Sequence, residues 1–115
     1  MIGIIGAMEK EMSLLCETMG TFSSEKIGSF EFHTGKIEGK DVTLLRCGIG
    51  KVNAAVGCAL LIQKFNPSYV INTGSAGGVN PELKVGDAII SSGLFYHDVG
   101  ARSVGQGFDC AYWDM

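Results

Sequence analysis

Two acidic residues close to the start of the chain are the first candidates for chemistry. Glu9 and Glu11 flank Lys10 directly after a short apolar run that ends in glycine, where a helix is predicted to begin. Residues two apart in a helix point about 200° away from each other, so the two carboxylates cannot share one role. Glu11 lies off the apolar stripe of this helix and could act as a general base for water at the strand end. The alternative is that both are solvated acids favoured by the helix dipole.

Two glycine-rich segments follow predicted strands and could approach a ligand with bare backbone. Gly48-Ile49-Gly50 is like the start of a dinucleotide fingerprint, but Asn53 takes the third glycine position and residues 70–72 offer no acid for a ribose. A tight strand-to-helix turn is the better interpretation, although a non-phosphate ligand could still contact this backbone. In residues 73–78 the small side chains admit a flat ligand, and Ser75 adds a hydroxyl. A glycine turn without a ligand is an equal alternative there.

The histidines and cysteines show no metal or disulfide pattern. The four cysteines include no CxxC pair, and neither histidine stands at metal-ligand spacing from them. Buried free thiols are expected, since cysteine is often a core residue. His97 and Asp98 could form an orienting pair, but neighbouring side chains of a strand point to opposite faces and the chain has no GxSxG elbow. We therefore expect no metal site and a structural role for this pair.

The elements that must position these residues are predicted from the spacing of the apolar residues. A strand over residues 1–6 precedes a helix that ends at Gly20 as its C-cap, and a meander of short strands occupies residues 27–47. A second helix is predicted over residues 51–65, before Asn66-Pro67. The apolar stripe of the first helix consists of Met8, Met12, Leu15 and Met19, and the apolar face of the second consists of Val52, Ala55, Val56, Ala59 and Ile62.

Further strands are predicted beyond the second helix. Residues 69–72 are expected to form a buried strand, residues 87–91 another, and residues 94–99 one more. This order of strands and helices is that of an α/β fold, in which ligands bind at the carboxyl ends of the strands. The remainder of the chain has no regular period but carries three large aromatic residues near its end. We expect either a sequence that stops within a fold or a tail that packs on a partner.

Length, composition and charge restrict the class of protein further. A chain of 115 residues holds at most one domain. Hydrophobic residues make up 46% and charged residues only 18%, which argues against disorder and fits strands buried on both faces. A net charge of -3 without a Lys/Arg cluster argues against a nucleic-acid partner. The longest apolar run, residues 54–62, is too short to span a membrane and the start does not resemble a signal peptide, so a cytoplasmic protein is expected.

Five segments, in order along residues 1–98, closely resemble the bacterial 5'-methylthioadenosine/S-adenosylhomocysteine nucleosidases of the purine nucleoside phosphorylase-like superfamily. They are residues 2–11, 48–55, 71–78, 83–87 and 96–98, which read IGIIGAMEKE, GIGKVNAA, INTGSAGG, LKVGD and YHD. The resemblance implies an α/β phosphorylase/hydrolase-like fold with a mixed central sheet flanked by helices. Residues 1–115 would be the N-terminal part of a single such domain, apparently truncated. The resemblance also implies a homodimer that uses no metal and no cofactor.

The resemblance implies a reaction and assigns residues to it. The reaction is hydrolysis of the bond between adenine and ribose in a 5'-thio-substituted adenosine, which gives free adenine and a thioribose. By resemblance, Glu11 orients and activates the attacking water, while Met8 and Ile49 line the pocket for the ribose and the 5'-thio group. The residues implied to bind near the base are Ser75, Ala76 and Gly77.

One part of the family's site has no counterpart in this sequence. In the family, the Asp that protonates adenine and the Met-Glu pair that holds the ribose hydroxyls lie in a C-terminal half, and residues 106–115 do not match them. The resemblance therefore implies that this chain supplies part of a site. We expect the chain alone to have no useful turnover.

Other functions stay open at this point. A nucleoside phosphorylase of the same superfamily needs fixed cations for phosphate, and residues 7–11 and 72–75 contain no arginine, which favours hydrolysis. A futalosine-type hydrolase is a closer relation that the sequence does not exclude. The alternative from another class is a non-catalytic module that binds an adenine-like ligand or a partner subunit.

Overall fold

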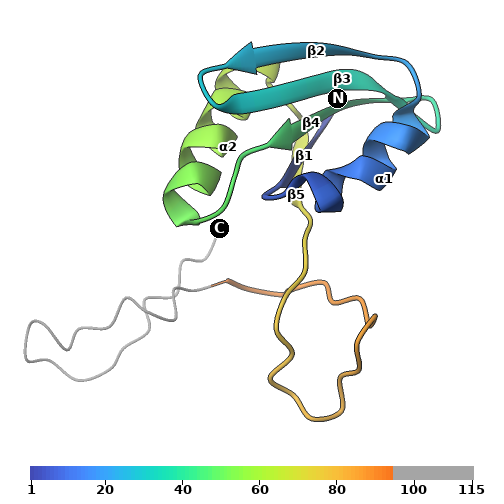
Figure 1. Cartoon of the computed structure of the whole chain (residues 1–115), viewed down its shortest axis with the longest axis vertical. Helices are drawn as coiled ribbons and strands as arrows, with labels where there is room; N and C mark the ends of the chain where they lie inside the picture. Colours follow the sequence, from blue (N-terminus) through green and yellow to red (C-terminus); the bar gives the residue numbers. More distant parts are fainter. Residues whose placement is uncertain (95–115) are drawn as a thin grey trace, which may run out of the picture. The chain divides into compact units, whose positions relative to one another are not determined.

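Residues 1–94 are the part of the chain that the computed structural model describes. The chain divides into a first unit, Met1–Gly77, and a second unit that begins at Gly78. The helices and strands found among the described residues all belong to the first unit (Figure 1). In chain order they are β1 (Ile2–Gly6), α1 (Glu9–Met19), β2 (Phe22–Ile27), β3 (Phe30–Ile37), β4 (Lys40–Arg46), α2 (Lys51–Phe65) and β5 (Tyr69–Asn72).

The five strands form one mixed sheet in the order β2-β3-β4-β1-β5. β1 runs parallel to both of its neighbours, β4 and β5, whereas β2, β3 and β4 are antiparallel neighbours. The carboxyl ends of β1, β4 and β5 therefore meet at one edge of the sheet, where the segments that carry Glu11, Ile49 and Ser75 begin. The predicted α/β class with a mixed central sheet is confirmed.

The two helices cover opposite faces of the sheet (Figure 1). Leu44 and Leu45 follow each other on β4, point to opposite faces and are both fully buried. Leu44 packs in one cluster with Met12 and Met19 of α1, and Leu45 packs in another with Leu61 of α2. The predicted stripe of the first helix is confirmed at Met12 and Met19, and the C-cap is Gly20 with a φ of 67°.

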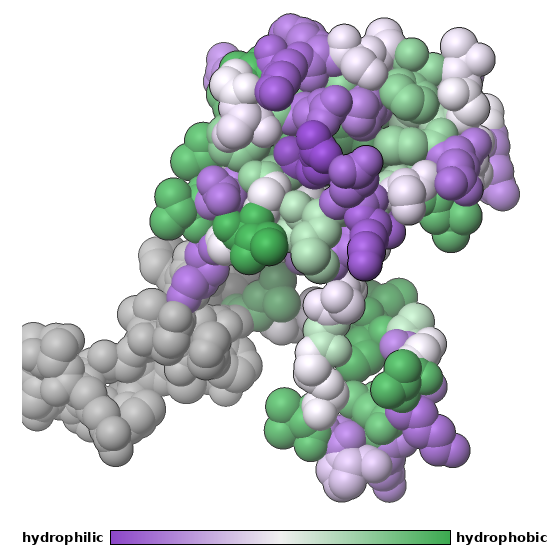
Figure 2. Space-filling view, in the orientation of Figure 1, coloured by the Kyte–Doolittle hydropathy of each residue, from purple (hydrophilic) through white to green (hydrophobic). Residues whose placement is uncertain are grey.

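The apolar face predicted for the second helix is not its buried face. α2 is buried at Gly57 and Leu61, whereas Val52 is 77% exposed and Val56 and Ile62 are exposed too. Ala55 and Ala59, the alanines of that face, are likewise exposed, and Figure 2 shows green apolar side chains over α2. The reason is close packing. A side chain at residue 57 would meet atoms of β3, β4 and residue 47 at 3.0 to 3.2 Å, so the glycine side of the helix faces the sheet.

The strand predicted over residues 69–72 forms but is not buried, and the strand predicted over residues 87–91 is absent. β5 is predicted to be buried, but all four of its residues are exposed. This strand lies at the edge of the sheet, and the two buried clusters that hold the helices include none of its residues. No strand forms over residues 87–91 either. A strand requires a hydrogen-bonded neighbour, and residues 78–94 have none within the described chain.

Several predictions fall wholly or partly outside the described residues. The strand predicted over residues 94–99 extends beyond them, and the His97-Asp98 pair, the aromatic tail and Cys110 lie outside them. The three remaining cysteines, Cys16, Cys47 and Cys58, are free thiols, of which Cys47 is buried.

No helix within residues 1–94 has the length and apolar character needed to cross a membrane. The same residues contain no group of three or more His, Cys, Asp or Glu that could hold a metal ion.

Candidate active site

Glu11 folds back onto the turn between β1 and α1. Met8 is the N-cap residue of α1, with extended backbone, so Glu11 is the third residue of the helix. Its Oε2 atom accepts hydrogen bonds from the backbone N–H groups of Ala7 and Met8, both at 3.1 Å. The first N–H groups of a helix have no partner within the helix, and a Glu at this position satisfies them. The helix start therefore holds the carboxylate in place.

The second oxygen of Glu11 reaches the segment that follows β5. Pairing with β1 continues past the end of β5, because the Thr73 N–H donates to the Ile5 carbonyl at 3.0 Å. Two residues further on, Ser75 reaches Glu11, and its N–H and hydroxyl both donate to Oε1, at 3.2 Å and 3.3 Å. Residues 64 positions apart in the sequence thus meet at the carboxyl ends of two parallel strands, where the sequence analysis expected a site.

Four hydrogen bonds to one carboxylate determine its charge state. They lower the pKa of Glu11 below its ordinary value of 4.5, and the Ser75 N–H is the largest cause, followed by the Met8 N–H. The carboxyl group is therefore ionised at neutral pH. An ionised carboxylate can take a proton from a water molecule and can stabilise a nearby positive charge. Glu9, two residues earlier, instead accepts a hydrogen bond from Arg46.

The segment between β4 and α2 is a tight turn. Gly48 and Gly50 have φ values of 85° and 102°, which residues other than glycine rarely adopt. The Asn53 side chain donates to the Ile49 carbonyl at 2.7 Å and closes the turn from inside the helix. The Ile49 side chain is 74% exposed. The glycines at 48 and 50 therefore serve the turn, and the Ile49 side chain between them is exposed.

The structure brings together some of the predicted site residues and leaves others apart. Glu11 contacts the backbone of Met8 and both the backbone and side chain of Ser75. Ala76 and Gly77 follow Ser75 and are exposed. Within residues 1–94, the hydrogen bonds of Glu11 do not reach Ile49, Ala76 or Gly77. Sequence analysis missed the amides of Ala7 and Met8 as partners of Glu11, although a Glu three positions after the cap is a signal for them.

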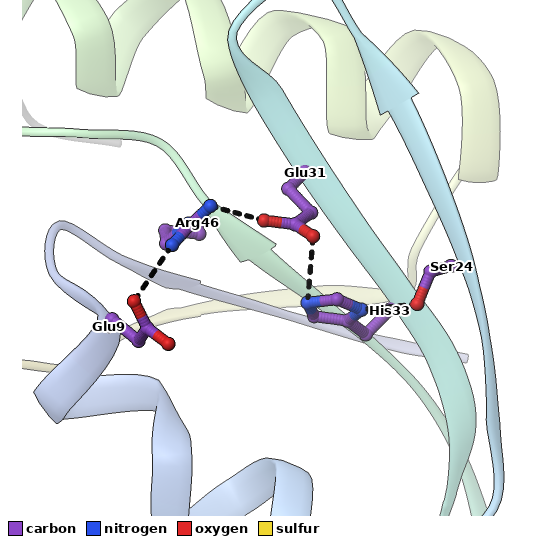
Figure 3. Close-up of polar contacts among 5 residues, drawn as sticks. All are labelled: Glu9, Ser24, Glu31, His33 and Arg46. Atoms are coloured by element: carbon purple, nitrogen blue, oxygen red, sulfur yellow. Dashed lines mark hydrogen bonds and ion pairs between the residues drawn. The ribbon is translucent and has the colours of Figure 1, made fainter.

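A second group of polar side chains links α1 to strands β2, β3 and β4 (Figure 3). Arg46, the last residue of β4, donates to Glu9 at 3.2 Å and to Glu31. Glu31 lies 3.9 Å from the His33 ring, and the other ring nitrogen of His33 is 2.8 Å from the Ser24 hydroxyl. The guanidinium charge at the start of α1 is thus compensated by two carboxylates. We name these five residues the Arg46 network.

The Arg46 network was also missed by sequence analysis, although the hairpin contains a signal for it. β3 and β4 are joined by residues 38–39, both of which have positive φ, as a two-residue hairpin turn requires. Counting back from this turn along both strands places Glu31 opposite Arg46. The apolar pattern predicts only a meander of short strands over residues 27–47, which leaves that register undefined.

The fold and this site define a class of protein. The chain belongs to the phosphorylase superfamily, whose family model matches residues 1–114. The relatives that it resembles within this superfamily have a narrower function. A 5'-methylthioadenosine/S-adenosylhomocysteine nucleosidase from Halalkalibacterium halodurans is 53% identical over 107 residues, which cover 93% of this chain and 46% of the relative.

Solved structures give the same result. The nucleosidase from Colwellia psychrerythraea, in complex with adenine, matches with a TM-score of 0.86 and 47% identity over 91% of this chain and 43% of that one. The nucleosidase from Neisseria meningitidis, in complex with methylthio-immucillin-A, matches with a TM-score of 0.85 and 45% identity over 91% and 46%. The family resemblance and the fold expected from the sequence are confirmed. The chain spans about half the length of the curated relatives it matches.

Proposed function

We propose that this chain supplies the catalytic base and part of the substrate pocket of a nucleosidase that hydrolyses the N-glycosidic bond of 5'-methylthioadenosine and S-adenosylhomocysteine. One observation carries the proposal. The Glu11 carboxylate is held by four donors at the strand ends of a chain whose relatives are named nucleosidases. An ionised base at this edge is what hydrolysis of a nucleoside requires.

The chemistry follows from the charges that develop in the reaction. As the bond between C1' and the base breaks, adenine keeps the electron pair and takes a proton from an acid, while the sugar becomes oxocarbenium-like. The oxygen of water bonds to C1' and its proton passes to Glu11, whose negative charge also stabilises the sugar cation. By family resemblance the acid lies in a C-terminal half, so we expect the chain alone to release no adenine at a useful rate.

The exposed side chains that follow the carboxyl ends of β1, β4 and β5 suit a nucleoside. We assign Met8 and Ile49 to the ribose and 5'-thio group, because both side chains are apolar and exposed. We assign Ser75, Ala76 and Gly77 to the neighbourhood of the base, because small residues let their backbone amides and carbonyls approach a flat ring. The Colwellia psychrerythraea relative holds adenine, which supports a purine ligand.

Hydrolysis is favoured over phosphorolysis by the state of Arg46, the one arginine within residues 1–94. A phosphorylase needs a cation free to hold phosphate. Arg46 stands at the start of α1, but Glu9 and Glu31 both accept hydrogen bonds from its guanidinium. An arginine paired with two carboxylates offers little net positive charge to an anion.

We further propose a homodimer in the cytoplasm. The exposed apolar face of α2 supports an association surface, since apolar patches of this kind mark protein interfaces. The free thiols of Cys16, Cys47 and Cys58 support a reducing compartment. Analytical ultracentrifugation of the purified chain tests the dimer, and a monomer at all concentrations would contradict it.

A full-length chimera tests the proposed reaction. The aligned 107 residues of this chain replace their counterparts in the Halalkalibacterium halodurans nucleosidase, and adenine release from 5'-methylthioadenosine is followed in phosphate-free buffer. We expect activity, and we expect Glu11→Gln to lower kcat by about 10²- to 10⁴-fold because the base is lost. Glu9→Gln is the matched control and should leave kcat nearly unchanged.

The other functions predict different outcomes of the same experiment. Activity that requires phosphate would identify a phosphorylase. A folded but inactive chimera, or turnover that survives Glu11→Gln, would overturn the proposal. Calorimetry of the 115-residue chain with 5'-methylthioadenosine separates the remaining alternative, because binding together with an inactive chimera would indicate a binding module. Adenine release by the chain alone would contradict the expectation that it supplies only part of the site.

A further inference from the structure

We propose that Gly74 is a positioning residue of this site, because the space left by its missing side chain is where the Glu11 carboxylate lies. A Cβ atom at residue 74 would stand 2.9 Å from Glu11 Oε1, 3.2 Å from Cδ and 3.4 Å from Oε2. The three nearest atoms therefore all belong to one carboxylate. That this carboxylate serves hydrolysis rests on the proposed function, but the positioning itself does not.

The backbone of Gly74 does not explain the glycine. Six glycines of the described chain have positive φ, where a side chain is strained, and Gly74 is not among them. An alanine could adopt the same backbone conformation. Glycine is thus required here for the close approach of Glu11 and not for a turn.

The consequence of a side chain at residue 74 falls on the hydrogen bonds of Glu11. The added methyl group would push Oε1 away from the N–H and hydroxyl of the adjacent Ser75. Oε2 cannot follow freely, because the amides of Ala7 and Met8 hold it at 3.1 Å. A carboxylate at the end of a flexible side chain can move at low cost to the fold. The main effect is therefore expected on the position and pKa of Glu11, with little change in stability.

Other glycines of the first unit act differently. A Cβ at Gly3 would contact Leu61 and Pro67, and one at Gly6 would contact Met12, so these two positions serve the packing of helices on β1. Gly77, three residues after Gly74, has no atom within 4 Å of an added Cβ and no positive φ. Gly77→Ala is therefore a matched control in the same segment for the geometry of Glu11.

NMR titration of the 115-residue chain tests the proposal without any need for turnover. The side-chain carboxyl ¹³C signal of Glu11 and the amide signal of Ser75 are followed from neutral to acidic pH. In the unmodified chain and in Gly77→Ala, we expect Glu11 to titrate below 4.5 and the Ser75 amide to shift with it. In Gly74→Ala, we expect the Glu11 pKa to return toward 4.5 and the Ser75 amide to lose that dependence. The Cys47 thiol near Glu11 does not interfere, because burial raises its pKa.

The results separate this proposal from the proposed function. If Gly74→Ala leaves the Glu11 pKa and the Ser75 amide unchanged, the positioning role is wrong whatever the chimera does. If Gly74→Ala fails to fold, the double variant Gly74→Ala/Glu11→Asp shortens the acid by one methylene and should fold again. Failure of that double variant would also overturn the proposal, since the clash would then involve a group other than Glu11.

Discussion

Strand β1 has a neighbour on each side, and the two neighbours differ in burial although both carry apolar side chains opposite β1. Ile4 of β1 lies opposite Leu44 of β4 and opposite Ile71 of β5. Leu44 is 0% exposed and Ile71 is 49% exposed. The difference arises because α1 and α2 pack against β1, β3 and β4, and neither buried cluster extends to β5. Strand formation depends on the hydrogen-bonded neighbour, whereas burial depends on the layers above and below it.

Replacement of the two matched residues should expose this difference most strongly. We expect Leu44→Ala to lower the free energy of unfolding by about 2 to 5 kcal/mol, as for a buried leucine whose loss leaves a cavity. Ile71→Ala should cost about 1 kcal/mol or less, because much of that side chain is already in water. Urea unfolding followed by circular dichroism measures both. Equal losses would show that β5 is covered in solution.

A second comparison contrasts the two sides of α2. Gly57→Ala adds a methyl group that would lie 3.0 Å from the Cβ atom of Cys47. The Cys47 backbone is fixed, because its N–H donates a hydrogen bond to the Gly6 carbonyl. Overpacking costs about 1 to 3 kcal/mol, which exceeds the gain of about 1 kcal/mol in helix propensity. We expect a net loss of about 1 kcal/mol. Val56→Ala, on the exposed side, should change stability by less than about 0.5 kcal/mol. A stabilising Gly57→Ala would contradict the close packing of this helix.

The same contrast explains how far the sequence predicted the fold. The apolar periods predicted both helices correctly, and α2 spans the predicted residues 51–65. They did not identify the buried side of α2, because close approach at Gly57 outweighs the greater apolar area of the valine face. β2 was missed because its residues are mostly exposed and lack an apolar alternation. The edge strand β2 forms because it pairs with β3, and the residues of β2 alone do not reveal that pairing.

The candidate site was predictable where the chemistry is local. The offset of Glu11 from the apolar stripe distinguished it from Glu9. The positions of Glu11 after β1 and of Ser75 after β5 placed these two residues at the carboxyl ends of the strands. The contact between Glu11 and Ser75 spans 64 residues and depends on the parallel pairing of β1 and β5, which no local pattern specifies. The role of Gly74 depends on the same long-range approach. The roles expected for the site residues stay predictions: catalysis by Glu11, and binding by Met8, Ile49, Ser75, Ala76 and Gly77.

A smaller effect is expected within the Arg46 network, whose two carboxylates differ in exposure. The side chain of Glu31 is 30% exposed and that of Glu9 is 83% exposed. Exposed ion pairs contribute about 0.2 to 1 kcal/mol. Double-mutant cycles with Arg46→Ala should give a coupling near the upper end of this range with Glu31→Ala, and near the lower end with Glu9→Ala. A larger coupling to Glu9 would mean that Arg46 chiefly anchors the start of α1.

The smallest effect compares two carboxylates whose pKa is lowered for different reasons. Backbone N–H groups of Ser75 and Met8 chiefly lower the pKa of Glu11, whereas a hydrogen bond and charge from Lys36 lower that of Asp41 in the β3–β4 hairpin. Each lowered pKa gives stability that is present above the ordinary pKa and is lost as the pH falls through the folded-state pKa. Glu11→Gln and Asp41→Asn should therefore each reduce the loss of stability between neutral pH and about pH 3.

Salt should separate these two contributions. In about 0.5 M NaCl the charge of Lys36 is screened over a few ångströms, and this exposed pair lies at the surface. The effect of Asp41→Asn on the acid dependence of the urea midpoint should then shrink. The effect of Glu11→Gln should persist, because its partners are fixed amide dipoles and a hydroxyl and not a mobile cation. If salt reduced both effects equally, the low pKa of Glu11 would arise from the surrounding charges, and the strand-end amides would not be what keeps this base ionised.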